Sequence, residues 1–206
     1  LTAETLKFSP YLDLTKEEFK NKYLSKITIG NRSDIQVFQP SSFGEDPENF
    51  DWRSKNVVTP VKDQGQCGSC WAFSAVGNIE SQHLIKNGGE PVQFSEQQLI
   101  DCVRGGVSEG CKGGDMVDAL RYLIRVGGIE KQISYSYTGK DGKCKFSSLL
   151  VSETVSDLVQ IERDEKKIKK AVLEIGPLIV GLDASSLQFY TKGSIIRQNS
   201  NCGQTE

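Results

Sequence analysis

The amino-acid sequence predicts an α+β protein in which helices come first and strands follow. Three helix signatures fall between residues 70 and 128, whereas short apolar runs typical of strands appear after residue 154. Helices that precede strands along a chain are typical of α+β architectures, in which the two kinds of element are segregated. The 206 residues are enough to bury a core in one or two small domains. We therefore expect a helical domain and a partly present β domain.

The N-terminal part is predicted to contain one short helix and a long connection. Thr15 and Glu18 form a capping box, in which each residue satisfies an amide of the other at the start of a helix. That helix should run to about Leu24. Residues 29–49 are rich in Ser, Asn, Gly, Pro and acidic residues, a composition that indicates an extended linker. The composition changes at Phe50, where the linker ends.

Three further helices carry start and stop signals. One follows residue 70, because apolar residues recur at helical spacing up to residue 79 and an Asn-Gly-Gly run at 87–89 supplies its end. Ser95 and Gln98 form a second capping box ahead of an apolar pair. Asp115 caps the third helix, which has apolar residues at 120, 123 and 124 and ends at the Gly-Gly pair at 127–128.

The C-terminal half is predicted to mix turns, strands and one helix. Thr138–Gly142 has the composition of a turn, and Val155–Ile161 is predicted as a strand. Asp164 caps an amphipathic helix with apolar residues at 168, 172 and 175, which Gly176-Pro177 ends. Leu178–Val180 is then predicted as a short buried strand, because it is an uninterrupted apolar run.

Composition and charge exclude several classes of protein. Lys and Arg number 25 and Asp and Glu number 27, and a net charge of −2 argues against nucleic acid as the main partner. No run approaches the ~18 apolar residues of a membrane span, and 37% apolar residues exclude a disordered tail. The single histidine excludes any site that needs two imidazoles from this chain. We expect no metal, no cofactor and no membrane partner.

The six cysteines admit several interpretations. An even number allows three disulfides in fifteen pairings, which would suit an oxidising compartment. Cys67 and Cys70 could instead be a redox pair, although the run before them is polar rather than a core strand. A zinc site is a third interpretation, although structural zinc sites favour two close pairs. It would use Cys67, Cys70, Cys102 and Cys111. Separately, Asn31 starts a glycosylation acceptor triplet.

Cys70 lies where a polar loop meets the start of a helix. The N-terminus of a helix carries unpaired N–H groups and about half a positive charge, so it stabilises the nucleophilic thiolate form of a cysteine. Attack of that thiolate on a carbonyl creates an oxyanion, which needs hydrogen-bond donors. The Cys70 N–H is one candidate donor and the side-chain amide of Gln64 is another. The alternatives are a small buried residue at Cys70 and an ordinary surface glutamine at Gln64.

Six segments of the chain match one enzyme family, in the same order. They are Asp51-Trp-Arg53, Val58–Gly65, Cys67–Trp71, Ser95–Cys102, Cys111–Gly114 and Gly139–Cys144. The segment Cys67-Gly-Ser-Cys-Trp71 is a signature of the nucleophile in this family. The chain therefore resembles the papain-like cysteine proteases, in their cathepsin L-like branch, over residues 46–206. The resemblance implies a two-domain α+β fold, with an essentially complete helical domain and an incomplete β-barrel domain.

The resemblance implies roles for individual residues. Cys70 corresponds to the nucleophile and Gln64 to the oxyanion donor. Gly113 and Gly114 correspond to the ledge that hydrogen-bonds the substrate backbone, where the lack of a side chain permits close approach. Met116 corresponds to a position that lines the main specificity pocket. Gly181 corresponds to a second position that lines this pocket. The resemblance also implies two disulfides, Cys67–Cys111 and Cys102–Cys144.

The resemblance also divides the chain. Tyr11–Phe19 is similar to the second half of the family's inhibitory propeptide, of which an aromatic-x-Asp element is present. Residues 1–45 are thus expected to be the C-terminal part of the propeptide with its linker. Residues 46–206 are expected to be a peptidase domain that lacks its C-terminal part, so that the mature enzyme begins near Asp46.

The catalytic base is not expected among these residues. The family places a His and an Asn about 130–150 residues after the nucleophile, and His83 is the only histidine here. His83 follows Cys70 by thirteen residues on the same helix, so it lies roughly 20 Å away, beyond hydrogen-bond reach. Residues 202–206 are similar to the run before the catalytic His. Cys202 is therefore expected to lack its partner in this fragment.

The sequence as a whole predicts a cysteine endopeptidase proenzyme that hydrolyses peptide bonds through a Cys70 thioester. The fragment itself is expected to be inactive. Expected partners are protein or peptide substrates, the propeptide as an intramolecular inhibitor, and cystatin-type inhibitors. We expect a monomer that is lysosomal or secreted. The alternative is a catalytically dead homologue that binds or inhibits, although Cys70 and Gln64 are both intact.

Overall fold

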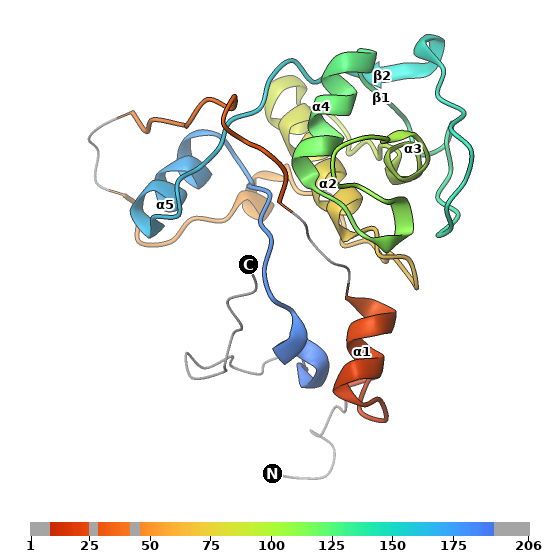
Figure 1. Ribbon diagram of the computed structural model, residues 1–206. Helices are drawn as coiled ribbons and strands as arrows, with labels where there is room; N and C mark the ends of the chain where they lie inside the picture. Colours follow the sequence, from red (N-terminus) through yellow and green to blue (C-terminus); the bar gives the residue numbers. More distant parts are fainter. Residues whose placement is uncertain (1–8, 25–28, 42–45, 192–206) are drawn as a thin grey trace.

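A computed structural model describes residues 9–24, 29–41 and 46–191 of the chain (Figure 1). Helices dominate the described part, and its sheet has two strands, so the α+β class predicted from the sequence is confirmed. The α-helices are α1 (Lys16–Tyr23), α2 (Cys70–Asn87), α3 (Glu96–Cys102), α4 (Met116–Val126) and α5 (Glu165–Glu174). The strands are β1 (Ile129–Glu130) and β2 (Val151–Glu153). Short 3-10 helices are η2 (Trp52–Lys55), η3 (Gly110–Lys112), η4 (Ser148–Leu150) and η5 (Ser185–Phe189).

Four of the five α-helices in the described ranges begin directly after the capping residues that the sequence predicted. Thr15 and Glu18 form the reciprocal capping box of α1. Asp115 accepts from the Val117 N–H at the start of α4, and Asp164 accepts from the Lys167 N–H at the start of α5. Each of these bonds satisfies an amide that has no partner within its helix.

The capping box predicted at Ser95 is only half formed. The Ser95 hydroxyl accepts from the Gln98 N–H at 2.9 Å, as expected. The Gln98 side chain does not reach back, because it is fully buried and serves the sheet instead. It donates to the Gly128 carbonyl at 3.1 Å and accepts from the Glu130 N–H at 2.8 Å. The Gln98 side chain thus makes tertiary hydrogen bonds instead of the capping bond to Ser95.

The strand predictions were wrong in position. The second strand is Val151–Glu153, which pairs antiparallel with β1, and Val155–Ile161 contributes a single bridge through Gln160 to Val37. Leu178–Val180 is irregular, and Val180 is 63% exposed. An apolar run becomes a strand only where a neighbouring strand pairs with its backbone. The described residues supply no such neighbour beside residues 178–180.

The core lies between α2, α3, α4 and the sheet. Its largest fully buried apolar side chains are Trp71, Phe94, Leu99, Ile100, Leu123 and Ile129. Each such burial is worth about 1.5–3 kcal/mol relative to exposure. The end of α5 packs against α2, where Asn78 and Gln82 donate to the Pro177 and Ile175 carbonyls. No helix in the described ranges is long and apolar enough to cross a membrane.

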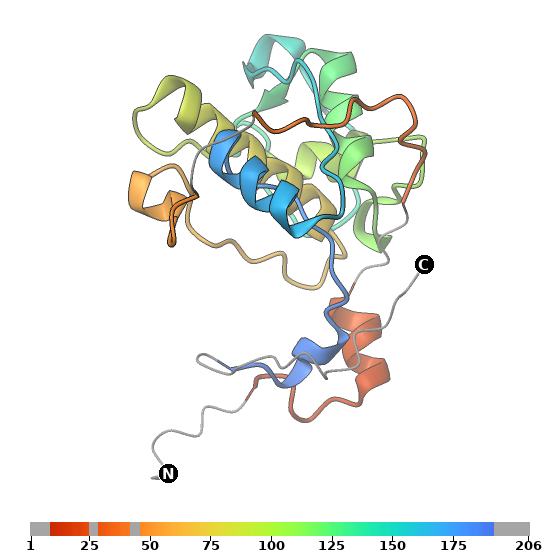
Figure 2. The same ribbon diagram turned by 90° about the vertical axis from the view of Figure 1, so that its left-hand side faces the viewer.

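Two N-terminal segments lie against the rest of the chain. In Figure 2, α1 and η5 lie side by side, apart from the main body. The Gln188 side chain of η5 joins them by donating to the Leu14 and Tyr11 carbonyls, at 2.7 and 3.2 Å. Residues 29–41, which we call the strap, follow α1. The strap bonds Asp115, the N-cap residue of α4, and the Phe38 N–H donates to the Gln160 carbonyl at 2.8 Å.

Candidate active site

Cys70 is the first residue of α2 and carries a half-buried thiol rather than a disulfide. The preceding residue, Ser69, makes no side-chain capping bond to the helix. Its hydroxyl instead contacts the Tyr137 hydroxyl at 2.9 Å and donates weakly to the Cys67 carbonyl at 3.4 Å. The Ser69 side chain therefore satisfies none of the N–H groups at the positive end of α2, where Cys70 lies.

Gln64 lies in the loop that leads into α2. Its side-chain amide donates to the Cys67 carbonyl at 2.9 Å, which fixes the orientation of the amide. An amide nitrogen carries two hydrogens, so this bond leaves a second donor. The turn at Gly65 has φ +62°, and a left-handed backbone of this kind favours glycine. The loop thus holds an oriented amide on the carbonyl of Cys67, three residues before the start of α2.

Tyr137 braces this loop, a role that the sequence reasoning missed. Its hydroxyl donates to the Gln64 carbonyl at 2.6 Å and contacts the Ser69 hydroxyl. Its ring packs edge-to-face on Phe73 with 5.0 Å between centroids. Burial raises the pKa of Tyr137, so its hydroxyl remains a donor at neutral pH. Tyr137 is 73 residues from Gln64 and no local motif signals the contact.

The first disulfide joins the Cys70 loop to the predicted ledge. Cys67 is bonded to Cys111, with 4.7 Å between their Cα atoms, and the Gly68 N–H donates to the Cys111 carbonyl at 2.7 Å. The Trp71 indole donates to the Gly110 carbonyl at 3.0 Å. These contacts hold η3 and the residues after it beside the start of α2.

The disulfides decide between the interpretations of the cysteines. They are Cys67–Cys111 and Cys102–Cys144, the pairs that the family resemblance implies. A redox pair of Cys67 with Cys70 is contradicted because Cys67 is bonded to Cys111, and a zinc site of four thiolates is contradicted because Cys67, Cys102 and Cys111 are all in disulfides. Among the described residues, no group of three metal-binding side chains gathers. Cys202 lies outside the described residues.

The ledge residues are buried beside Trp71. Gly113 has φ +126°, a region that favours glycine. A Cβ on Gly114 would lie 2.7 Å from two atoms of the Trp71 ring and 2.8 Å from the Ser108 hydroxyl. Met116 starts α4 and is 8% exposed, whereas Gly181 is exposed on the segment between α5 and η5. The roles of these four residues in binding remain predictions.

A buried ionic network supports the loop that carries Gln64. Lys62 pairs with Glu80 at 2.5 Å and with Glu96 at 2.6 Å, and both carboxylates are fully buried. Glu80 also accepts from the Thr59 hydroxyl at 2.6 Å and the Phe94 N–H at 2.9 Å. Burial raises the pKa of Glu96, although the Lys62 ammonium opposes this shift. The network ties the loop to α2 and α3 at the same point.

His83 is engaged elsewhere. Its Nδ1 pairs with a carboxylate oxygen of Glu153 in β2, and its ring packs edge-to-face on Phe94 with 5.6 Å between centroids. Burial alone would raise the pKa of Glu153, but hydrogen bonds from His83 and the Thr154 N–H lower it. His83 therefore links α2 to the sheet and does not serve Cys70.

The predicted glycosylation residue lies in the strap. Asn31 is exposed, and its side-chain oxygen accepts from the Ser33 N–H at 3.0 Å. Its backbone carbonyl accepts from the Arg121 guanidinium of α4 at 3.0 Å. Exposure is compatible with modification, which stays a prediction.

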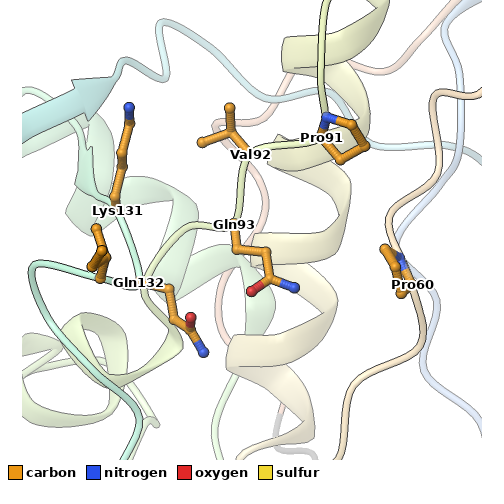
Figure 3. Close-up of a pocket in the computed structure, with 7 residues that line it drawn as sticks. Pro60, Pro91, Val92, Gln93, Lys131 and Gln132 are labelled. Carbon is orange, nitrogen blue, oxygen red and sulfur yellow. The ribbon is translucent and has the colours of Figure 1, made fainter.

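The larger of two surface cavities lies away from Cys70. It has a volume of about 440 Å³, and Pro60 lies across it from Lys131 (Figure 3). A smaller cavity of about 140 Å³ borders Lys62, Glu96 and Tyr137. Neither is lined by Cys70, Gln64 or the ledge glycines.

The chain is similar to known proteins over most of its length. Residues 46–206 match the family described as papain family cysteine protease. The chain is 41% identical over 189 residues to digestive cysteine proteinase 3 of Homarus americanus, covering 91% of this chain and 58% of that protein. It is 40% identical over 208 residues to procathepsin L of Rattus norvegicus, covering 98% of this chain and 60% of that protein.

A solved structure is also similar to the chain over most of its length. Digestive procathepsin L 3 of the Tenebrio molitor larval midgut superimposes with a TM-score of 0.80 at 35% identity. The alignment covers 97% of this chain and 64% of that chain. The present chain thus spans about three-fifths of the length of the relatives that it matches.

Proposed function

The chain belongs to the papain family of cysteine proteases, and on that premise we propose that the full-length protein is a thiol-dependent endopeptidase. One observation carries the proposal. Cys70 starts α2, whose N-cap residue Ser69 makes no side-chain capping bond, and the oriented amide of Gln64 lies in the adjoining loop. A nucleophile and an oxyanion donor are the two groups that acyl transfer needs first.

In the proposed mechanism, the Cys70 thiolate attacks the carbonyl carbon of the scissile peptide bond. The Cys70 N–H and the second N–H of the Gln64 amide hydrogen-bond the oxyanion that forms. The leaving amine takes a proton, and the peptide acyl group stays on sulfur as a thioester. Water then attacks the thioester, which releases the acid and restores the thiol. Ordered donors of this kind are worth about 10²–10³ in rate each.

The proton transfers require a base that residues 1–206 do not supply. Their single histidine, His83, lies far along α2 and pairs with Glu153. We therefore propose that residues 1–206 alone do not hydrolyse peptides. Cleavage of a fluorogenic dipeptide substrate by this purified chain, with loss of the cleavage in Cys70→Ala, would overturn that proposal.

We further propose that residues 1–45 are the C-terminal part of an inhibitory propeptide and that residues 46–206 belong to the peptidase domain. The packing of α1 on η5 and of the strap on α4 supports this division, as does the similarity to procathepsins. Two disulfides support an oxidising compartment, lysosomal or extracellular. Protein substrates and cystatin-type inhibitors are the proposed partners of a monomeric enzyme.

The test is hydrolysis of fluorogenic peptides by the full-length protein after removal of residues 1–45. We expect activity that Cys70→Ala abolishes and that Gln64→Ala lowers by about 10²–10³ in kcat. Gln66→Ala, in the exposed part of the same loop, is the matched control and should retain activity. Activity that survives Cys70→Ala contradicts the proposal.

A further inference from the structure

We infer that Asp115 is a specificity-determining residue that binds an arginine side chain of the substrate, in the place that Arg32 of the strap holds in this structure. The inference rests on the proposed peptidase function and names the class of peptide that the site prefers. It concerns peptides with arginine on the N-terminal side of the scissile bond. Arg32 and Asp115 are 83 residues apart in the sequence and form an ion pair at 2.8 Å.

Asp115 is fully buried beneath the strap. Its Oδ1 accepts from the Arg32 guanidinium and from the Val117 N–H, at 2.8 and 3.0 Å. Its Oδ2 accepts from the Gly30 N–H at 2.9 Å. A Cβ on Gly30 would lie 3.3 Å from Oδ2, so the strap backbone packs directly on the carboxylate. Two of the three hydrogen bonds to the Asp115 carboxylate thus come from a segment that the proposed activation removes.

Asp115 adjoins the proposed substrate-binding ledge. It directly follows Gly114, and Gly114 packs on Trp71, the residue after Cys70. The Cys67–Cys111 disulfide holds the same loop against the start of α2. A peptide that extends along Gly113 and Gly114 toward Cys70 would therefore pass its side chains close to the Asp115 carboxylate.

Removal of the strap leaves the carboxylate suited to arginine. Oδ2 loses the Gly30 N–H and Oδ1 loses Arg32, so both oxygens become available together. A guanidinium can then donate to both, in the two-pronged geometry that strengthens arginine–carboxylate pairs. In the described structure Arg32 bonds through Nη2 alone, and its buried Nε has no hydrogen-bond partner. A substrate arginine is not held by the strap backbone and can use both prongs.

The competing interpretation is that Asp115 serves only as the N-cap of α4. The substitution Asp115→Asn separates the two, because asparagine caps helices about as well as aspartate but carries no charge. Asp118→Asn is the matched control. Asp118 lies in the same helical turn, but its carboxylate bonds the Val107 N–H and the Ser108 hydroxyl.

The experiment uses full-length protein from which residues 1–45 have been removed. Arginine, citrulline and leucine are placed in turn at each position N-terminal to the scissile bond of one fluorogenic peptide, and kcat/KM is measured. At one position we expect arginine to exceed citrulline, its uncharged isostere, by about tenfold or more, as for hydrogen bonds between charged groups. Asp115→Asn should abolish that ratio, whereas Asp118→Asn should keep it.

A binding measurement separates recognition from catalysis. A labelled peptide of residues 29–41 and its citrulline-32 counterpart are titrated onto the same proteins by fluorescence anisotropy. The peptide with arginine at position 32 should bind about tenfold more tightly than the citrulline peptide, and Asp115→Asn should remove this difference in affinity. Absence of all hydrolysis with this binding difference intact refutes the peptidase function but supports arginine recognition by Asp115. The inference is overturned if arginine and citrulline peptides have equal kcat/KM and equal affinity. It is also overturned if a preference for arginine survives Asp115→Asn.

Discussion

The substitution Lys62→Met tests how the loop before Cys70 is held in place. Lys62 lies between two buried carboxylates, and its side chain is 18% exposed. Methionine fills a similar volume but removes the ammonium group. Glu80 and Glu96 would then face each other without a cation, each in an environment closed to solvent.

The expected cost follows from that burial. Removal of one partner from a buried ion pair destabilises proteins by about 3–5 kcal/mol, because the remaining charge has lost its compensation. The pKa of Glu96 is already raised by burial, and loss of Lys62 raises it further. A carboxyl whose folded pKa is raised favours the folded state at low pH and loses that contribution as the pH rises through the folded pKa. The deficit should therefore be larger at pH 7 than at pH 4.5.

Urea unfolding under non-reducing conditions at both pH values measures the deficit. The control is Lys167→Met, which breaks the exposed pair of Lys167 with Glu162 and should cost less than about 1 kcal/mol. The reasoning is refuted if the two substitutions cost the same, or if the Lys62→Met deficit is greater at pH 4.5 than at pH 7.

Two further substitutions test packing and pH dependence. Gly114→Ala places a methyl group against the buried ring of Trp71 and should cost about 1–3 kcal/mol of unfolding free energy. The control Gly77→Ala, where a Cβ meets open space within α2, should stabilise by up to about 1 kcal/mol, and equal effects would contradict the packing argument. Glu153→Gln removes a carboxylate whose lowered pKa gives stability above pH 4.5 that is lost as the pH falls through that pKa. The melting temperature of Glu153→Gln should therefore lie below that of wild type at pH 6, and the two should converge at pH 3. A difference in melting temperature that stays the same at both pH values would show that the pair of Glu153 with His83 contributes nothing.

The helices could be predicted from the sequence because their signals are local. Capping residues such as Thr15, Asp115 and Asp164 act within three residues, and the glycines after α2 and α4 end those helices. Strands were placed less well, because pairing depends on residues distant in sequence. β1 is two residues long, and its partner lies more than twenty residues further along.

The candidate site was predicted in part. The position of Cys70 at a helix start follows from local sequence, and the roles of Gln64 and the glycine ledge came from resemblance to a family. Contacts across long separations could not be read from the sequence. The main examples are the hydrogen bond from Tyr137 to the Gln64 carbonyl and the ion pair of Arg32 with Asp115. Asp115 was identified only as a helix cap, because a cap and an ion-pair partner have the same residue type.

The central claim is that Cys70 is the nucleophile of a cysteine peptidase. The most direct measurement treats the activated full-length protein with a peptidyl chloromethyl ketone and locates the adduct by mass spectrometry while hydrolysis is followed. We expect a single thioether, on Cys70, with activity lost in proportion to the fraction of Cys70 modified. Full modification of Cys70 with undiminished hydrolysis, or loss of activity with the adduct on another residue, would contradict the account.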